Sequence, residues 1–141
     1  MCLSLTVSVP VSAQPALEAA VAALPGDSLP VSILWRMPLL ERRVRATIAR
    51  TAGDCGCSLL SDAADWNAAA WDFVSEVREP LARTLEHLAN ARLPDFWFEA
   101  LWAGDSPSER RVMTPLTLAA LARGNQISTC TRYVVPSPPA A

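Results

Sequence analysis

Two cysteines one residue apart, Cys55 and Cys57, are the residues of this sequence best suited to chemistry. Thiolates bind soft metal ions, and they act as nucleophiles where the surroundings lower their pKa. A tetrahedral zinc site would need more ligands, so Cys2 and Cys130, or His87, would have to converge on the same loop. Zinc sites usually space paired cysteines by about two to four residues. We therefore expect four reduced cysteines and no cofactor, with a zinc or thiol-dependent site at Cys55 and Cys57 as the alternative.

The single histidine, His87, is the strongest candidate for a general base. It falls beside the apolar stripe of a predicted helix, near the end of that helix, where an imidazole interacts favourably with the negative helix terminus. A general base needs a nucleophile within hydrogen-bond distance, and the sequence contains no recognisable serine or cysteine partner. Because only fragments of a catalytic set occur, we expect that the protein is not an enzyme.

Arginines gather in one stretch of the chain. They are Arg36, Arg42, Arg43, Arg45 and Arg50. In a strand, Arg43 and Arg45 would point to the same face and could form a site for an anion. No glycine-rich phosphate loop accompanies them. The favoured interpretation is that these arginines pair with an acidic helix further along the chain.

The tryptophans suggest a surface that binds a partner protein. The spacing of apolar residues places Trp71 and Trp97 outside the predicted inward faces, and exposed tryptophans are favoured interface anchors. The predicted partner-binding residues are Trp71, Asp72, Trp97, Arg43 and Arg45. We expect Trp71 to be exposed, with coverage by the last helix as the alternative. The favoured function is a non-enzymatic protein-binding or regulatory module of unknown partner, and a homodimer is compatible with it.

The composition excludes several classes of protein. A net charge of −2 gives no electrostatic reason to bind nucleic acid. No apolar run approaches the roughly 18 residues of a membrane-spanning helix, and a chain of this size needs no disulfide framework, so the cytoplasm is expected. All 12 basic residues are arginine, which together with the abundant alanine indicates a GC-rich bacterial genome.

Five segments alternate apolar and polar residues with the period of two that is typical of half-buried strands. They cover residues 2–9, 31–37, 43–50, 96–102 and 127–135. For 43–50 a helix is the alternative, because the apolar residues there also fit helical spacing.

Three further segments carry apolar residues at the spacing of an amphipathic helix. They cover residues 15–24, 61–91 and 115–123. Ser12 and Thr114 are the expected N-caps of the first and last helix. The long middle helix is expected to bury Trp66 and Phe73, and at Pro80 we expect either a kink or a break into two abutting helices.

The predicted order is β-α-β-β-α-β followed by α-β. The first six elements match the ferredoxin-like, split β-α-β core, in which two helices cover one face of a four-stranded antiparallel sheet. The added C-terminal helix and strand would extend that sheet. We therefore expect one α+β domain over residues 1–135 and a proline-rich tail at 136–141, which cannot join a sheet.

Overall fold

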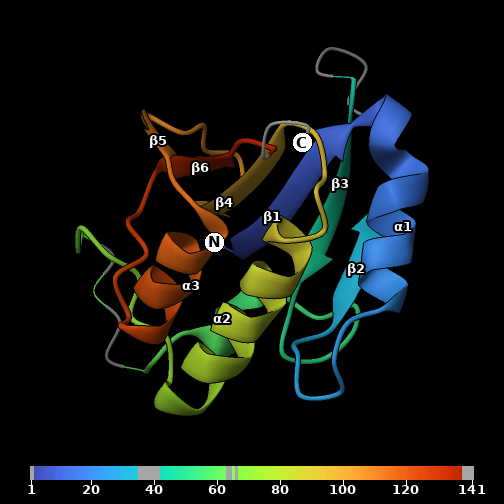
Figure 1. Cartoon of the computed structure of the whole chain (residues 1–141). Helices are drawn as coiled ribbons and strands as arrows, with labels where there is room; N and C mark the ends of the chain where they lie inside the picture. The colour runs from blue at the N-terminus through green and yellow to red at the C-terminus, as the bar shows by residue number, and fades with distance from the viewer. Residues whose placement is uncertain (1, 35–41, 63–64, 66, 138–141) are drawn as a thin grey trace.

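The computed structural model of the chain describes residues 2–34, 42–62, 65 and 67–137. Within these residues the chain forms a six-stranded sheet with three α-helices (Figure 1). The α+β class expected from the sequence is thereby confirmed.

The sheet places the first strand of the chain in its interior. The strands are β1 (Leu3–Pro10), β2 (Val31–Leu34), β3 (Arg43–Ile48), β4 (Phe96–Trp102), β5 (Glu109–Val112) and β6 (Thr131–Val135). Their order in space is β2-β3-β1-β4-β6-β5. Neighbouring strands are antiparallel, except that β5 runs parallel to β6.

The helices cover one face of this sheet. They are α1 (Gln14–Ala22), α2 (Ser75–Ala89) and α3 (Pro115–Arg123), with short 3-10 turns η1 (Val11–Ala13) and η2 (Gly56–Leu59). Figure 1 shows all three α-helices on the same side of the sheet, with α2 in the middle. No helix in the described part of the chain is both long and apolar enough to span a membrane.

The apolar face predicted for each central strand is buried, and in β1 Thr6 and Ser8 of the opposite face are buried as well. In β1 the odd-numbered residues from Leu3 to Val9 are at most 2% exposed, and they face the helices. In β3 the even-numbered residues from Val44 to Ile48 are also at most 2% exposed, so this segment is a strand and not the alternative helix. Because successive side chains of a strand point to opposite faces, the core lies between this side of the sheet and the helices.

The predicted long helix is wrong in its first half, because α2 begins only at Ser75. The backbone groups of the segment before α2 form hydrogen bonds other than those of a helix. The N–H of Ser61 donates to the carbonyl oxygen of Asp72, and the N–H of Trp71 donates to that of Ile127. Pairing within the segment and with the distant Ile127 satisfies these backbone groups as a helix would have done. Trp66 lies outside the described residues.

Several boundaries also differ from the prediction. The exposed strand β5 was missed, because none of its residues is buried and no apolar alternation marks it. Ser12 does not cap α1, since it lies in η1 and the N-cap of α1 is Ala13, without a side-chain hydrogen bond. The segment around Pro80 is one helix and not two abutting helices, since α2 continues from Ser75 to Ala89. Trp35, which was expected on the second strand, lies outside the described residues.

Other local predictions are confirmed. Thr114 caps α3, because its side chain accepts a hydrogen bond from the N–H of Thr117, and Gly124 ends this helix. Strand β4 covers Phe96 to Trp102 as expected.

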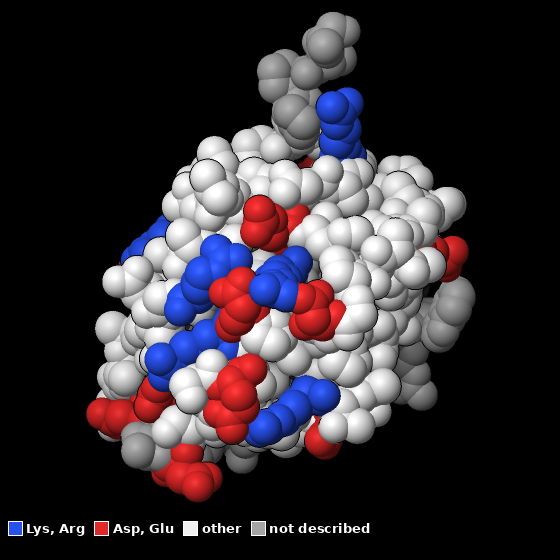
Figure 2. All heavy atoms as spheres, turned by 60° about the horizontal axis from the view of Figure 1, so that its bottom comes forward, with Lys and Arg blue, Asp and Glu red and all other residues white. Residues whose placement is uncertain are grey.

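Charged side chains of both signs lie intermixed on the face of the molecule shown in Figure 2. Around α2, Glu79 accepts hydrogen bonds from Arg83 and Arg123. Arg50 lies 3.6 Å from Glu76 of the same helix, so this arginine pairs with the acidic helix as expected. These pairs are exposed, and each therefore adds little to stability.

Candidate functional site

Three cysteine thiols meet at the start of β1. The sulfur atoms of Cys2, Cys55 and Cys57 all lie within 4.8 Å of one another. Cys2 is exposed, the other two are half-buried, and all three are free thiols. Of the further ligands that a tetrahedral site required, Cys2 lies beside Cys55 and Cys57, whereas neither Cys130 nor His87 joins them.

The turn η2 brings Cys55 and Cys57 against the strand. The Sγ of Cys55 caps the turn by accepting a hydrogen bond from the N–H of Cys57 at 3.4 Å. Between them, a Cβ on Gly56 would lie 2.7 Å from the carbonyl oxygen of Leu3, closer than real Cβ atoms approach. Glycine is therefore what allows the turn to lie this close to β1.

The backbone of Leu3 fixes both thiols of the turn. Its N–H donates a hydrogen bond to the Sγ of Cys57 at 3.1 Å. The thiol of Cys55 donates a hydrogen bond to the carbonyl oxygen of Leu3 at 3.8 Å. The cluster is thus tied to a central strand, which is the most rigid kind of support for a binding site.

Hydrogen bonds and charges in the cluster shift the pKa values of Cys55 and Cys2 in opposite directions. The hydrogen bond from the backbone N–H of Cys57 lowers the pKa of Cys55, and the side chain of Cys57 adds to this effect. The pKa of Cys2 is raised, first by its hydrogen bond to Cys55 and then by the neighbouring thiolate charges. As the pH rises, Cys55 therefore becomes a thiolate before Cys2 does.

The donor atoms of this cluster are all sulfur. Among the described residues, no histidine or carboxylate joins the three thiols within 4.8 Å. Zn–S bonds of about 2.3 Å in a tetrahedron place two sulfur atoms about 3.8 Å apart. The cluster would therefore close around a metal ion by movements of about 1 Å, which rotation of the exposed Cys2 side chain can supply.

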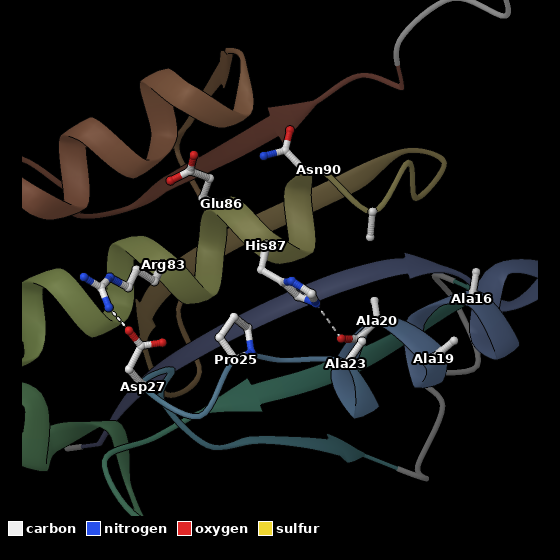
Figure 3. A pocket seen from close by; sticks show the side chains of 11 residues that line it. Ala16, Ala19, Ala20, Ala23, Pro25, Asp27, Arg83, Glu86, His87 and Asn90 are labelled. Atoms are coloured by element: carbon white, nitrogen blue, oxygen red, sulfur yellow. Dashed lines mark hydrogen bonds and ion pairs between the residues drawn. The ribbon is translucent and has the colours of Figure 1, made fainter.

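The other ligands considered from the sequence lie elsewhere. Cys130 does not belong to the thiol cluster, and its carbonyl oxygen accepts a hydrogen bond from the N–H of Ser108. The Nε2 of His87 lies 2.9 Å from the carbonyl oxygen of Ala20 on α1, in an open groove of about 850 Å³ between α1 and α2 (Figure 3). His87 therefore joins two helices, and it lies in the last turn of α2, where the sequence placed it.

The prediction that Trp71 is exposed is wrong. Its ring is 4% exposed, and its Nε1 donates to the carbonyl oxygen of Ala100 at 2.9 Å. The ring also packs edge-to-face with Trp102, so the end of β4 contributes to its burial. The neighbouring Asp72 accepts a hydrogen bond from the side chain of Asn125. Trp71 thus loses the exposure on which its assignment to a partner surface rested, whereas the side chain of Asp72 remains 41% exposed.

The remaining predicted partner residues lie on the sheet face away from the helices. Ser8 pairs with Arg45 on one side and with Trp97 on the other, which places these residues on the same face. Arg43 is 4% exposed, and its guanidinium lies 3.5 Å from the ring centroid of Trp97. Arg132 contributes a second guanidinium at 3.8 Å. Because Arg43 is buried in this stack, it cannot contact a partner directly, and its predicted role is corrected accordingly.

Comparisons with known proteins do not assign the site: no family model, no curated protein and no solved structure matches the chain. The geometry of the described residues is thus the basis for any function. The sequence named Cys2 as one of three possible further ligands and could not choose it, because only the packing of η2 on β1 reveals the approach of Cys2 to Cys55.

Proposed function

We propose that the protein binds a soft metal ion through the thiolates of Cys2, Cys55 and Cys57. The observation that supports this is the approach of the three sulfur atoms to within 4.8 Å, from two distant parts of the chain. Thiolates prefer soft ions such as Cu(I) and Zn²⁺ to hard ions such as Mg²⁺. The proposal reverses the preference drawn from the sequence, which treated the cysteines as incidental.

Cu(I) fits the donor set best. This ion is readily held by thiolates alone and accepts three of them, whereas Zn²⁺ takes four ligands in structural sites. Zinc would need a water molecule or a group from another molecule as its fourth ligand. Ligands must be deprotonated to bind, and the lowered pKa of Cys55 makes it available as a thiolate at a lower pH than Cys2.

The experiment is an anaerobic titration of the reduced protein with Cu(I) against a coloured chelator, followed by native mass spectrometry. We expect one bound ion per chain, and at least a tenfold loss of affinity in Cys2→Ser and in Cys55→Ser. Cys130→Ser is the matched control and should bind as the unchanged protein does. The proposal is wrong if the chelator strips the metal completely, or if the Cys2 and Cys55 variants bind like the control.

The reducing cytoplasm suits such a site. Closely spaced free thiols persist where glutathione and thioredoxin keep cysteines reduced, and they tend to form disulfides in oxidising compartments. We therefore keep the cytoplasm as the proposed location.

We also propose that β1 to β4 with α1 and α2 form a ferredoxin-like core. The support is the chain order β-α-β-β-α-β together with antiparallel pairing of β2 with β3, β3 with β1 and β1 with β4. In this proposal α3, β5 and β6 are the additions at the β4 edge. A fold of this kind hosts many functions and therefore does not favour any one of them.

Protein binding is the second candidate function, and the edge strand β5 is the feature that favours it. All four residues of β5 are exposed, and Val112 at its end is 58% exposed. Leu116, at the start of α3, is 68% exposed. An edge strand with free backbone groups can accept an extended peptide as a further strand. Arg110 and Arg111 favour an acidic segment, and two copies of β5 side by side would repel each other.

A pull-down with synthetic acidic peptides of strand-forming sequence tests this second candidate. Replacing Val112 by Pro removes a backbone donor from the edge and should abolish binding, whereas Thr117→Ala on α3 should not change it. Light scattering of the free protein checks for a homodimer. A dimer that Val112→Pro dissociates would show that the edge binds a second copy of the chain.

A further inference from the structure

A small cavity with aromatic and acidic walls lies beside the thiol cluster. Its volume is about 200 Å³, and its walls come from the end of β4 and from the segment that follows η2. The residues that matter for its chemistry are Cys57, Asp62, Asp65, Trp71, Asp72 and Trp102. The sequence alone does not bring these residues together, because the predicted helix places Trp71 on its outside.

Two tryptophans form the aromatic wall. The ring centroids of Trp71 and Trp102 are 4.8 Å apart, and their planes meet at 77°. Trp71 is fixed by its burial and by the hydrogen bond from its Nε1 to Ala100. Because that N–H is already used and the residue is 4% exposed, Trp71 contributes a small part of its ring to the wall, and the half-buried Trp102 contributes the larger part. A wall held in this way needs no ordering when a ligand binds.

Three carboxylates make the cavity negative. Asp62 and Asp65 are exposed, whereas Asp72 lies 3.6 Å from Arg78 and is partly neutralised. None of the described residues that line the cavity is basic. The face of a tryptophan ring also attracts positive charge. The aromatic wall and the acidic rim therefore both favour a positively charged ligand.

The spacing of the carboxylates argues against a metal ion in this cavity. Within the described residues, only the three cysteines bring three ligand atoms within 4.8 Å of one another. A hard cation needs several oxygen ligands at about 2.0–2.6 Å, which carboxylates this far apart do not provide together. They suit a larger cation whose charge is spread over several carbon atoms.

We propose that this cavity binds a small organic cation of the alkylated ammonium class. Such a group combines a positive charge for the carboxylates with methyl groups that pack against aromatic rings, and aromatic cages recognise quaternary ammonium in this way. A cavity of about 200 Å³ accommodates one such group. The inference does not depend on metal binding, because the cavity shares only Cys57 with the thiol cluster.

The experiment compares two ligands of nearly the same shape by calorimetric titration of the reduced, metal-free protein. Choline carries the positive charge, and 3,3-dimethylbutan-1-ol is its uncharged analogue. We expect choline to bind at least about tenfold more tightly, because the alcohol lacks both the cation–π and the ion-pair attraction. Equal affinity for the two compounds, or no binding of choline, would overturn the proposal.

Variants locate the binding in this cavity. The double change Asp62→Asn with Asp65→Asn removes charge at exposed positions, and it should weaken choline binding about tenfold while leaving the alcohol unaffected. Glu109→Gln removes an acid that does not line the cavity and should change nothing. Unchanged choline affinity in the double variant would place the binding elsewhere and refute the assignment. Cu(I) titration of the same variants measures metal binding by the thiol cluster independently. Failure of the organic-cation proposal is therefore distinguishable from failure of the metal-binding proposal.

Discussion

The carbonyl oxygen of Leu3 lies 2.7 Å from the position that a Cβ on Gly56 would occupy. This close approach joins the turn η2 to the central strand β1, and it sets Cys55 and Cys57 beside Cys2. The thiol cluster therefore depends on a residue that carries no side chain.

We expect Gly56→Ala to destabilise the protein by roughly 1–3 kcal/mol, because the obstructing atom is backbone and cannot turn away. The same change should push η2 from β1 and lower the affinity for Cu(I). Urea unfolding and the chelator competition measure the two effects. Gly26→Ala is the control, since nothing lies within 4 Å of a Cβ at that position. If the two variants behaved alike, the contact with Leu3 would not be what places the thiols.

Phe73 tests the packing of the segment that leads into α2. Its side chain is fully buried, so we expect Phe73→Ala to lower the free energy of unfolding by about 3–5 kcal/mol. Leu116→Ala, at a residue that is 68% exposed, should stay within about 0.5 kcal/mol of the unchanged protein. Denaturant unfolding gives both values. A loss below about 1 kcal/mol for Phe73→Ala would contradict the burial of this ring.

The opposite pKa shifts of two thiols give a prediction on pH. The pKa of Cys55 is lowered and that of Cys2 is raised, and the thiolate is the form that reacts. In the metal-free protein, alkylation of Cys55 should therefore reach its half-maximal rate at a lower pH than alkylation of Cys2. Timed reaction with iodoacetamide over a pH series, read by peptide mass spectrometry, measures both. The difference should vanish in concentrated urea, and a reversed order in the folded protein would refute the hydrogen-bond pattern.

The strands and the last helix were predictable because their signals are local. In β1 the alternation of apolar and polar residues follows directly from the pleat of a strand, so Leu3 to Val9 could be assigned to faces correctly. In α3 the cap Thr114 bonds to Thr117, only three residues further on. Both patterns depend only on residues that are close together in the sequence, so they can be recognised from the sequence alone.

The segment before α2 shows where such reasoning fails. Phe73 and Val74 continue the helical spacing of α2, yet the N–H of Trp71 pairs with Ile127, which lies far along the chain. Pairing of distant segments overrides the local preference for a helix. The approach of Cys2 to Cys55 is of the same nature, since it exists only once η2 packs on β1. The exposed strand β5 was missed because it has no apolar face to mark it.

Arg43 leads to the final prediction. Its Nε donates to the hydroxyl of Ser8 at 3.0 Å, and its Nη1 pairs with Asp95 at 2.8 Å. Its planar guanidinium also stacks on Trp97 at 3.5 Å. Lysine keeps the charge but has neither the fork of donors nor the flat surface, so the exchange is not conservative at this site. We expect Arg43→Lys to lower the free energy of unfolding by about 1–3 kcal/mol, since buried acceptors are left without a donor.

The matched control for Arg43→Lys is Arg83→Lys, because Arg83 pairs with Asp27 and Glu79 in a half-exposed position. Exposed ion pairs contribute little, so this variant should stay within about 0.5 kcal/mol of the unchanged protein. Raising the salt concentration should weaken the exposed pairs and leave the deficit of Arg43→Lys nearly unchanged, since burial shields that site from screening. Urea unfolding at low and high salt measures all four values. If the Arg43→Lys deficit disappeared at high salt, the stabilisation by Arg43 would be long-range charge attraction and not the buried hydrogen bonds and ring stacking described above.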